Sequence, residues 1–290
     1  ALFRSLLERH AHARADLRLP GYLVATNYDE FVLTAHLGRM QTVRKTLRNV
    51  LVVVGIAAIA TAGSVTPSSA GVTTPTDVAN IQPASGQKVG VAMPVTVTFT
   101  QSITNRAAAE RTIAITSPAT PAGSFTWLND RVLQWNPKGF WPAHSNIMVT
   151  AGGAKTTFES GAAVVGVADI DAHTFTVSID NQVVRTMPAS MGKPRHPTPI
   201  GSFTALEKQA SVVMDSRTIG IPLNDPEGYR LTVADAVRVT WGGVYVHSAP
   251  WSVQSQGNAN VSHGCINLSP DNAAWYYDTV HIGDPIIVQQ

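Results

Sequence analysis

Short runs of β-branched residues, each closed by Pro, Gly or Asn, constrain the fold of this 290-residue chain most strongly. Between residues 78 and 153 such runs follow one another closely, for example Val-Thr-Val-Thr-Phe at 95–99. β-Branched side chains favour extended backbone, and turn residues at this spacing are typical of a small β-sandwich. Three aromatic residues are expected in its core or at its edge: Trp127, Trp135 and Trp141.

The strand pattern resumes after a Gly- and Ala-rich connection at residues 160–166. Runs at 174–179 and 182–185 flank the dipeptide Asp180-Asn181, and polar turn residues between two such runs predict a β-hairpin. The chain after the signal-like segment described below therefore divides near Val165 into two domains. Both are expected to be mainly β.

One short helix is predicted late in the chain. Ser269 is a suitable N-cap, Pro270 suits the first turn, and Asp271 would lie beside the positive end of the helix dipole. The helical residues would continue through 273–280, and a last strand at 284–288 would close the second domain. No P-loop, dinucleotide fingerprint or sustained repeat is present in the sequence.

The segment that begins at Met40 has the residue order of a secretory signal: basic, then apolar at 50–62, then small. A membrane helix needs about 20 apolar residues, so a signal peptide at 40–70 is predicted, with an uncleaved membrane anchor as the alternative. Residues 1–39 do not suit a position before a signal. We therefore expect Met40 to be the true start, with a native extension as the alternative, and an extracytoplasmic protein of the periplasm or cell wall.

Charge and cysteine content narrow the choice of partners. The net charge of +2 divides into eight Lys or Arg against four acids up to residue 70, and thirteen against fifteen, a net of −2, beyond it. A protein without a basic surface is not expected to bind nucleic acid. One cysteine in the whole chain also means that no internal disulfide can form.

That single cysteine lies in a sequence suited to nucleophilic chemistry. Cys265 follows His263 and Gly264 in Ser-His-Gly-Cys-Ile-Asn, and His247 ends a separate apolar run. A thiolate attacks carbonyl carbon, so a catalytic cysteine needs an imidazole to accept its proton. His247 is the better candidate, because it can approach Cys265 from a neighbouring strand. Gly264 would allow a tight turn that aims main-chain amides at a developing oxyanion, which indicates acyl transfer.

Three residues of this motif alternate in sequence. In an extended segment His263, Cys265 and Asn267 would share one face, so His263 is expected to help shape the site. Two other interpretations compete with a nucleophile. A lone cysteine is most often a buried apolar residue. His247, His263 and Cys265 could also bind zinc, but no fourth ligand is evident and other histidines, such as His196, lie in unrelated contexts, so no metal is predicted.

The residues from His247 to Asn267, with fourteen between His247 and Ser262, resemble the signature of the L,D-transpeptidases, the YkuD-type cell-wall cross-linking enzymes. Met-Pro-Ala-Ser at 187–190 and Pro-Thr-Pro-Ile-Gly at 197–201 extend the resemblance. It points to the mycobacterial type, with one preceding immunoglobulin-like domain. The resemblance implies an immunoglobulin-like β-sandwich at 71–160 and a β-rich catalytic domain with a short helix at 166–290.

The resemblance also implies roles for individual residues. Cys265 would be the nucleophile, His247 the base, and the Ser248 backbone carbonyl the group that orients the imidazole. His263, Gly264 and the Cys265 amide would line the oxyanion site. Residues 203–232 would form a mobile lid. Four residues match positions around the substrate pocket: Met214, Tyr229, Trp251 and Asn267.

The reaction implied by the resemblance uses peptidoglycan stem peptides and no cofactor. Cys265 would attack a tetrapeptide donor, release D-alanine and pass the acyl group to the amine of a diaminopimelate acceptor, forming a 3-3 cross-link. Hydrolysis of the same thioester would make the protein an L,D-carboxypeptidase. Carbapenems would acylate the cysteine. The rival functions are a cysteine peptidoglycan hydrolase, in which cysteine usually precedes histidine, and a non-catalytic wall-binding protein.

Overall fold

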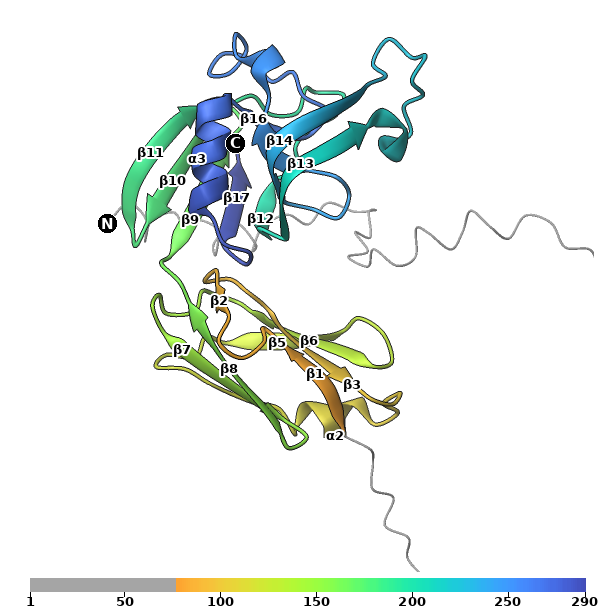
Figure 1. The fold of residues 1–290 in the computed structure, drawn as a ribbon, viewed down its shortest axis with the longest axis vertical. Helices are drawn as coiled ribbons and strands as arrows, with labels where there is room; N and C mark the ends of the chain where they lie inside the picture. Colours follow the sequence, from red (N-terminus) through yellow and green to blue (C-terminus); the bar gives the residue numbers. More distant parts are fainter. Residues whose placement is uncertain (1–76) are drawn as a thin grey trace, which may run out of the picture. The chain divides into compact units, whose positions relative to one another are not determined.

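The computed structural model describes residues 77–290 (Figure 1). The expectations for residues 1–39 and for a signal or anchor at 40–70 lie outside these described residues. Strands dominate the rest, which confirms the expected fold class. Among residues 77–290, none of the helices is both long enough and apolar enough to cross a membrane.

The first domain is a sandwich of two four-stranded sheets. One sheet is antiparallel and has the order β1 (Val78–Gln82), β3 (Val95–Phe99), β6 (Val132–Pro137) and β5 (Gly123–Trp127). The other has the order β2 (Lys88–Val89), β8 (Ala154–Ser160), β7 (Asn146–Ala151) and β4 (Ala114–Thr116). A short helix, α2 (Arg106–Glu110), lies between β3 and β4 in the sequence.

The core of the sandwich follows from the strand period of two. Val95, Val97 and Phe99 of β3 are buried, whereas the threonines between them are half-buried. Trp135 and Trp141 are buried in the same core, with ring centroids 5.1 Å apart. Trp127 is half-buried and stacks on Phe99 at 5.7 Å. These positions confirm the core and edge placement expected for the three tryptophans.

The second domain also contains two sheets. The larger has the order β11 (Gln182–Pro188), β10 (Thr174–Ile179), β9 (Val164–Asp169), β17 (Pro285–Gln289) and β12 (Gly201–Thr204). The smaller has the order β13 (Glu207–Asp215), β14 (Arg230–Arg238), β15 (Tyr245–Ser248) and β16 (Ile266–Leu268). Figure 1 shows β13 and β14 as a long hairpin.

Two local predictions for this domain are confirmed. Strands β10 and β11 form an antiparallel hairpin in which Asp180 and Asn181 have φ values of 48° and 68°. This left-handed backbone is tolerated by Asp and Asn and suits the tight turn of a hairpin. Helix α3 (Pro270–Thr279) begins directly after Ser269, although the serine side chain makes no capping hydrogen bond.

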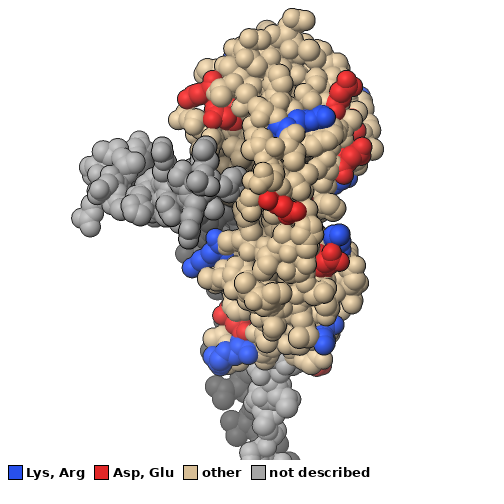
Figure 2. All heavy atoms as spheres, turned by 90° about the vertical axis from the view of Figure 1, so that its left-hand side faces the viewer, with Lys and Arg blue, Asp and Glu red and all other residues tan. Residues whose placement is uncertain are grey.

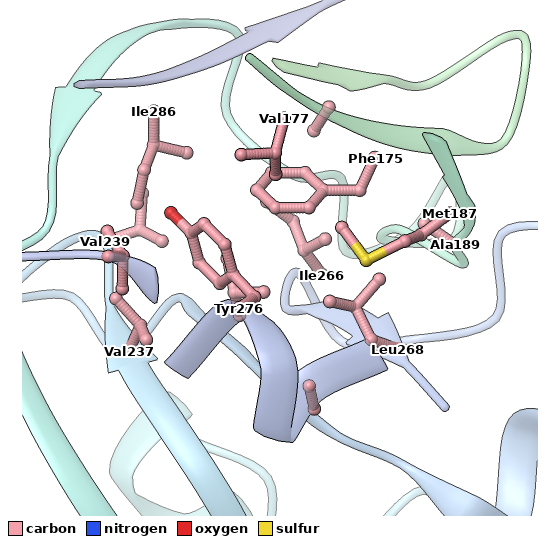
Figure 3. Packing of buried hydrophobic residues seen from close by; sticks show 14 of the residues in the cluster. Phe175, Val177, Met187, Ala189, Val237, Val239, Ile266, Leu268, Tyr276 and Ile286 are labelled. Carbon is pink, nitrogen blue, oxygen red and sulfur yellow. The ribbon is translucent and has the colours of Figure 1, made fainter. Parts of the chain in front are cut away.

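The core of the second domain holds the strand that follows the cysteine (Figure 3). Tyr276 of α3 packs edge-on against Phe175 of β10, with ring centroids 4.8 Å apart. Ile266 and Leu268 of β16 are fully buried in the same cluster. Burial of both side chains fixes the position of β16, and with it the end of the segment that carries Cys265.

Charged residues of both signs are mixed on one face of the molecule. On the face drawn in Figure 2, Lys and Arg side chains are interspersed with Asp and Glu among uncharged residues. A surface of this kind lacks the single-sign field that draws a polyanion to a protein. It agrees with the slightly negative balance of the sequence beyond residue 70.

Candidate active site

Two adjacent parallel strands carry the histidine and the cysteine. Strands β15 and β16 pair so that His247 lies opposite Asn267, and Cys265 directly precedes β16. Side chains two residues apart point to the same face of a sheet. His247, Cys265 and Asn267 accordingly line one cavity of about 580 Å³. The fold therefore brings to one cavity a thiol and an imidazole that are eighteen positions apart in the sequence.

The tautomer of His247 follows from its neighbour. The ring is buried, and its Nδ1 lies 2.8 Å from the backbone oxygen of Ser248. A carbonyl only accepts hydrogen bonds, so Nδ1 carries the proton and Nε2 keeps its lone pair. Burial lowers the pKa of His247, and the hydrogen bond to Ser248 opposes part of that shift. The imidazole is neutral at pH 7 and able to accept a proton.

The thiol of Cys265 is also neutral at rest. Burial raises its pKa to about 11, although a hydrogen bond from the Tyr245 backbone amide acts in the opposite direction. The side chain packs against an apolar cluster that includes Val233 and Met214. Its Sγ donates to the Gly243 carbonyl at 3.6 Å. The cavity is thus lined by a neutral thiol and a neutral imidazole, and a thiol in this state must lose its proton to a base before or during any attack on a carbonyl.

The residues before Cys265 form a tight turn. Gly264 has a φ of +114°, which only glycine adopts without strain. Ser262 Oγ accepts from the Gly264 amide at 3.0 Å and donates to the Cys265 carbonyl at 2.6 Å. The prediction of an extended segment from His263 to Asn267 is therefore wrong at its start, because the backbone bends at 263–264. His263 still lines the same cavity as Cys265.

The four residues matched to a substrate pocket all line this cavity: Met214, Tyr229, Trp251 and Asn267. The rings of Tyr229 and His263 have centroids 5.0 Å apart, and those of Trp251 and His247 lie 6.0 Å apart. Trp251 is 56% exposed, so much of its side chain is accessible to solvent. Contact of these four side chains with substrate stays a prediction.

The tip of the β13–β14 hairpin, residues 216–229, forms one wall of the cavity. Its start is the short helix Ser216–Ile219, and Glu227 and Tyr229 near its end line the cavity. The Ser216 hydroxyl accepts from the Tyr229 amide and donates to the Ile221 carbonyl, which closes the tip on itself. The tip lies where the sequence predicts a lid. Its movement stays a prediction.

A cluster of charges joins the hairpin tip to the turn that carries the cysteine. Glu227 accepts from Lys193 at 2.7 Å and lies 3.0 Å from Nε2 of His196. His196 and His263 have ring centroids 4.9 Å apart. Sequence reasoning assigned His196 to an unrelated context, which is wrong. Nothing in the sequence signals this contact, because a long folded segment separates His196 from His263.

Within residues 77–290, the group whose ligand atoms gather closely enough for a metal ion is His196, Glu227 and His263, all within 4.8 Å of one another. This set differs from the zinc set considered above. Lys193 Nζ lies 2.7 Å from Glu227 Oε1 and 3.3 Å from His263 Nε2. The ammonium thus supplies the positive charge that the carboxylate needs, and it must leave before a metal could enter. The arrangement favours an ion-pair cluster.

Two family models match the chain. The L,D-transpeptidase catalytic domain matches residues 163–288, and a bacterial Ig domain matches residues 54–156. A protein named L,D-transpeptidase 1 of Mycobacterium tuberculosis is 57% identical over 248 residues, which cover 84% of this chain and 99% of the relative. The chain belongs to the L,D-transpeptidase family.

Solved structures of other family members share this fold. An L,D-transpeptidase from Mycobacterium smegmatis is 68% identical, with a TM-score of 0.72, over 75% of this chain and all of the other. An L,D-transpeptidase solved in complex with imipenem is 60% identical, with a TM-score of 0.70, over 73% of this chain and 99% of the other. The immunoglobulin-like and catalytic folds implied by the sequence resemblance are thereby confirmed.

In this family member, replacing Glu227 with Gln should loosen the hairpin tip. Hydrogen bonds from Lys193 and then His196 lower the pKa of Glu227 to about 2. The carboxylate is therefore charged at pH 7, and its ion pairs are retained above pH 4.5 and lost as the pH falls toward 2. We expect Glu227→Gln to increase amide hydrogen exchange in residues 216–229 at pH 7.

Glu207 provides the matched control for this prediction. It pairs with Arg238 at 2.7 Å at the opposite end of the same hairpin. Glu207→Gln should leave exchange at the tip unchanged. Equal exchange at the tip in wild type and Glu227→Gln would show that the cluster does not hold it.

Proposed function

We propose that this protein is a peptidoglycan L,D-transpeptidase that forms 3-3 cross-links through a thioester on Cys265. The observation that carries the proposal is that His247 of β15 and Cys265, which directly precedes the paired strand β16, line the same cavity. The His247 lone pair at Nε2 supports its role as base. Family membership supports the choice of stem peptides as substrate.

In the first half-reaction, the Cys265 thiol gives its proton to His247 Nε2 as sulfur bonds to the carbonyl carbon before the terminal D-alanine of a tetrapeptide stem. The carbonyl electron pair moves to oxygen and forms an oxyanion. When the carbonyl reforms, the carbon–nitrogen bond breaks and the D-alanine nitrogen takes the proton from the imidazolium. A thioester and a neutral imidazole remain.

In the second half-reaction, the side-chain amine of a diaminopimelate residue in a neighbouring stem attacks the thioester. Its proton passes to His247, the carbon–sulfur bond breaks, and the leaving thiolate recovers a proton from the imidazolium. The product is a peptide bond between two diaminopimelate residues, and the enzyme returns to its starting state. Water in place of the amine would give a tripeptide, so carboxypeptidase activity uses the same intermediate.

The surroundings of the thiol support this order of steps. Apolar side chains pack against the thiol, so we expect the bound stem peptide to displace water from the space around it. Met214 and Trp251 would contact the stem peptide, and the Cys265 amide would face the oxyanion. Carbapenems carry a strained amide, so we expect them to acylate Cys265 by the same first step.

We also propose that the protein acts outside the cytoplasm. A signal or anchor at residues 40–70 would deliver the enzyme to the periplasm or cell wall, where its substrate lies. The immunoglobulin-like domain would act as a spacer between the membrane and the catalytic domain. Mass spectrometry of the native protein would test both the start at Met40 and removal of the signal.

The reaction is tested by incubating the protein with a disaccharide tetrapeptide and following the products by mass. We expect a dimer whose mass equals two tetrapeptide units minus D-alanine. Tripeptide without dimer would replace the proposal with a carboxypeptidase. Unchanged tetrapeptide that is still retained by the protein would indicate a wall-binding module and overturn an enzymatic function.

A further inference from the structure

Thr198 lies beneath the turn that carries the cysteine. Its side chain is buried, with 2% of its surface exposed, and its hydroxyl bridges two backbone groups. The Gly192 amide donates to Thr198 Oγ1 at 2.8 Å, and Thr198 Oγ1 donates to the Gly264 carbonyl at 2.9 Å. An amide can only donate, so the hydroxyl proton is directed at Gly264. The two hydrogen bonds therefore hold the Thr198 hydroxyl in one orientation.

This hydrogen bond fixes the direction of the next amide. The peptide between Gly264 and Cys265 is planar and trans, so its carbonyl and its N–H point in opposite directions. Because the carbonyl points to Thr198, the Cys265 N–H points away from Thr198. Cys265 lines the active-site cavity, whereas Thr198 lines a separate cavity of about 430 Å³. The Cys265 amide is therefore turned away from the side of the chain on which Thr198 lies.

The loop that holds Thr198 is closely attached to the turn. A Cβ atom at Gly192 would lie 2.2 Å from the His196 carbonyl oxygen, so residues 192–198 fold back tightly on themselves. The Ser262 amide donates to the Met191 carbonyl at 3.0 Å, and the Lys193 amide donates to the Ser262 carbonyl at 3.0 Å. The loop and the turn are thus joined at both Ser262 and Gly264.

We propose that Thr198 is a positioning residue that aims the Cys265 amide at the oxyanion formed during acylation. The proposal rests on the proposed cysteine acyl transfer. Gly264, at a φ of +114°, has little steric resistance to rotation of the following peptide, so another contact must hold it. Loss of one oxyanion donor costs about 10²- to 10³-fold in rate in well-studied enzymes, so misdirecting this amide should cost about 10- to 100-fold.

Two reagents distinguish an effect on the Cys265 amide from an effect on the Cys265 thiol. Imipenem acylates through a tetrahedral oxyanion, whereas iodoacetamide alkylates by displacement of iodide at a saturated carbon and forms no oxyanion. Separate samples of the full protein are reacted with each reagent, and adduct formation is followed by intact mass. We expect Thr198→Val, which matches threonine in shape, to slow acylation about 10- to 100-fold and to change alkylation by less than about threefold. Thr198→Ser, which keeps the hydroxyl, should restore the wild-type ratio of the two rates.

The remaining outcomes are also decisive. If Thr198→Val slows both reactions equally, the residue holds the thiol and the proposal is wrong. Unchanged acylation would overturn it as well. Should the valine variant fail to fold, Thr198→Ala gives the same comparison, with the melting temperature as the check on folding. If the wild-type chain itself forms no imipenem adduct, the proposed function fails, and that result is distinct from an unchanged ratio in the variant.

Discussion

Cys265→Ser should abolish both cross-link formation and covalent capture of imipenem. The substitution exchanges sulfur for oxygen in a nearly unchanged shape, but a serine hydroxyl gives up its proton far less readily than a thiol. In the part of the chain that the structure describes, the hydrogen-bond partner of the His247 ring is a main-chain carbonyl and not a carboxylate, which leaves the imidazole a weak base for such a hydroxyl. We expect the rate to fall by at least about 10⁴-fold, as for the loss of nucleophiles in other acyl-transfer enzymes. Intact mass after incubation with imipenem measures the loss directly.

The serine variant should remain folded, because serine is close to cysteine in size and its hydroxyl can donate to the Gly243 carbonyl that the thiol contacts. Its melting temperature serves as the control. An imipenem adduct of undiminished yield on Cys265→Ser would mean that another residue is acylated, and would remove Cys265 from the proposed mechanism.

His247→Ala should have the second largest effect and a distinctive pH dependence. With the general base absent, attack depends on the small fraction of Cys265 that ionises unaided. We expect acylation at pH 7 to fall by about 10²- to 10⁴-fold. Since burial raises the thiol pKa to about 11, the residual rate should increase about tenfold for each pH unit up to that value. Adduct formation measured from pH 6 to 10 tests this slope.

Ser248→Ala is the matched control for His247. The group that orients the imidazole is the Ser248 backbone carbonyl, which the substitution leaves in place. Activity close to that of the wild type is therefore expected. A flat pH profile in His247→Ala would show that the thiol is already ionised at rest, which would contradict a base mechanism.

Local sequence patterns predict much of this fold. The alternation in β3, the Asp180-Asn181 turn and the start of α3 each depend on residues close together in the chain. The signature around Cys265 identifies the family because its residues and spacing are read directly. In each case the physical cause is short-range: strand period, turn conformation or helix capping.

Long-range contacts explain what the sequence does not reveal. Glu227 meets Lys193 and His196 only after the hairpin tip folds over the turn, and no spacing rule links them. The sequence shows Thr198 only as part of the motif at 197–201. It does not predict the hydrogen bond of Thr198 to Gly264, because the acceptor is a main-chain carbonyl and every residue has one. The resting acceptor of the thiol is likewise a main-chain oxygen, that of Gly243.

The pairing of β15 with β16 has a consequence for how such a protein can change. Hydrogen-bonded strands are held about 4.8 Å apart, so the pairing fixes His247 beside Asn267, and Cys265 directly precedes the paired strand. Exposed residues of the hairpin tip and of the connection that carries Trp251 can then be exchanged while this pairing is kept. The residues that contact a ligand can thus diverge while the pairing of the two strands stays constant.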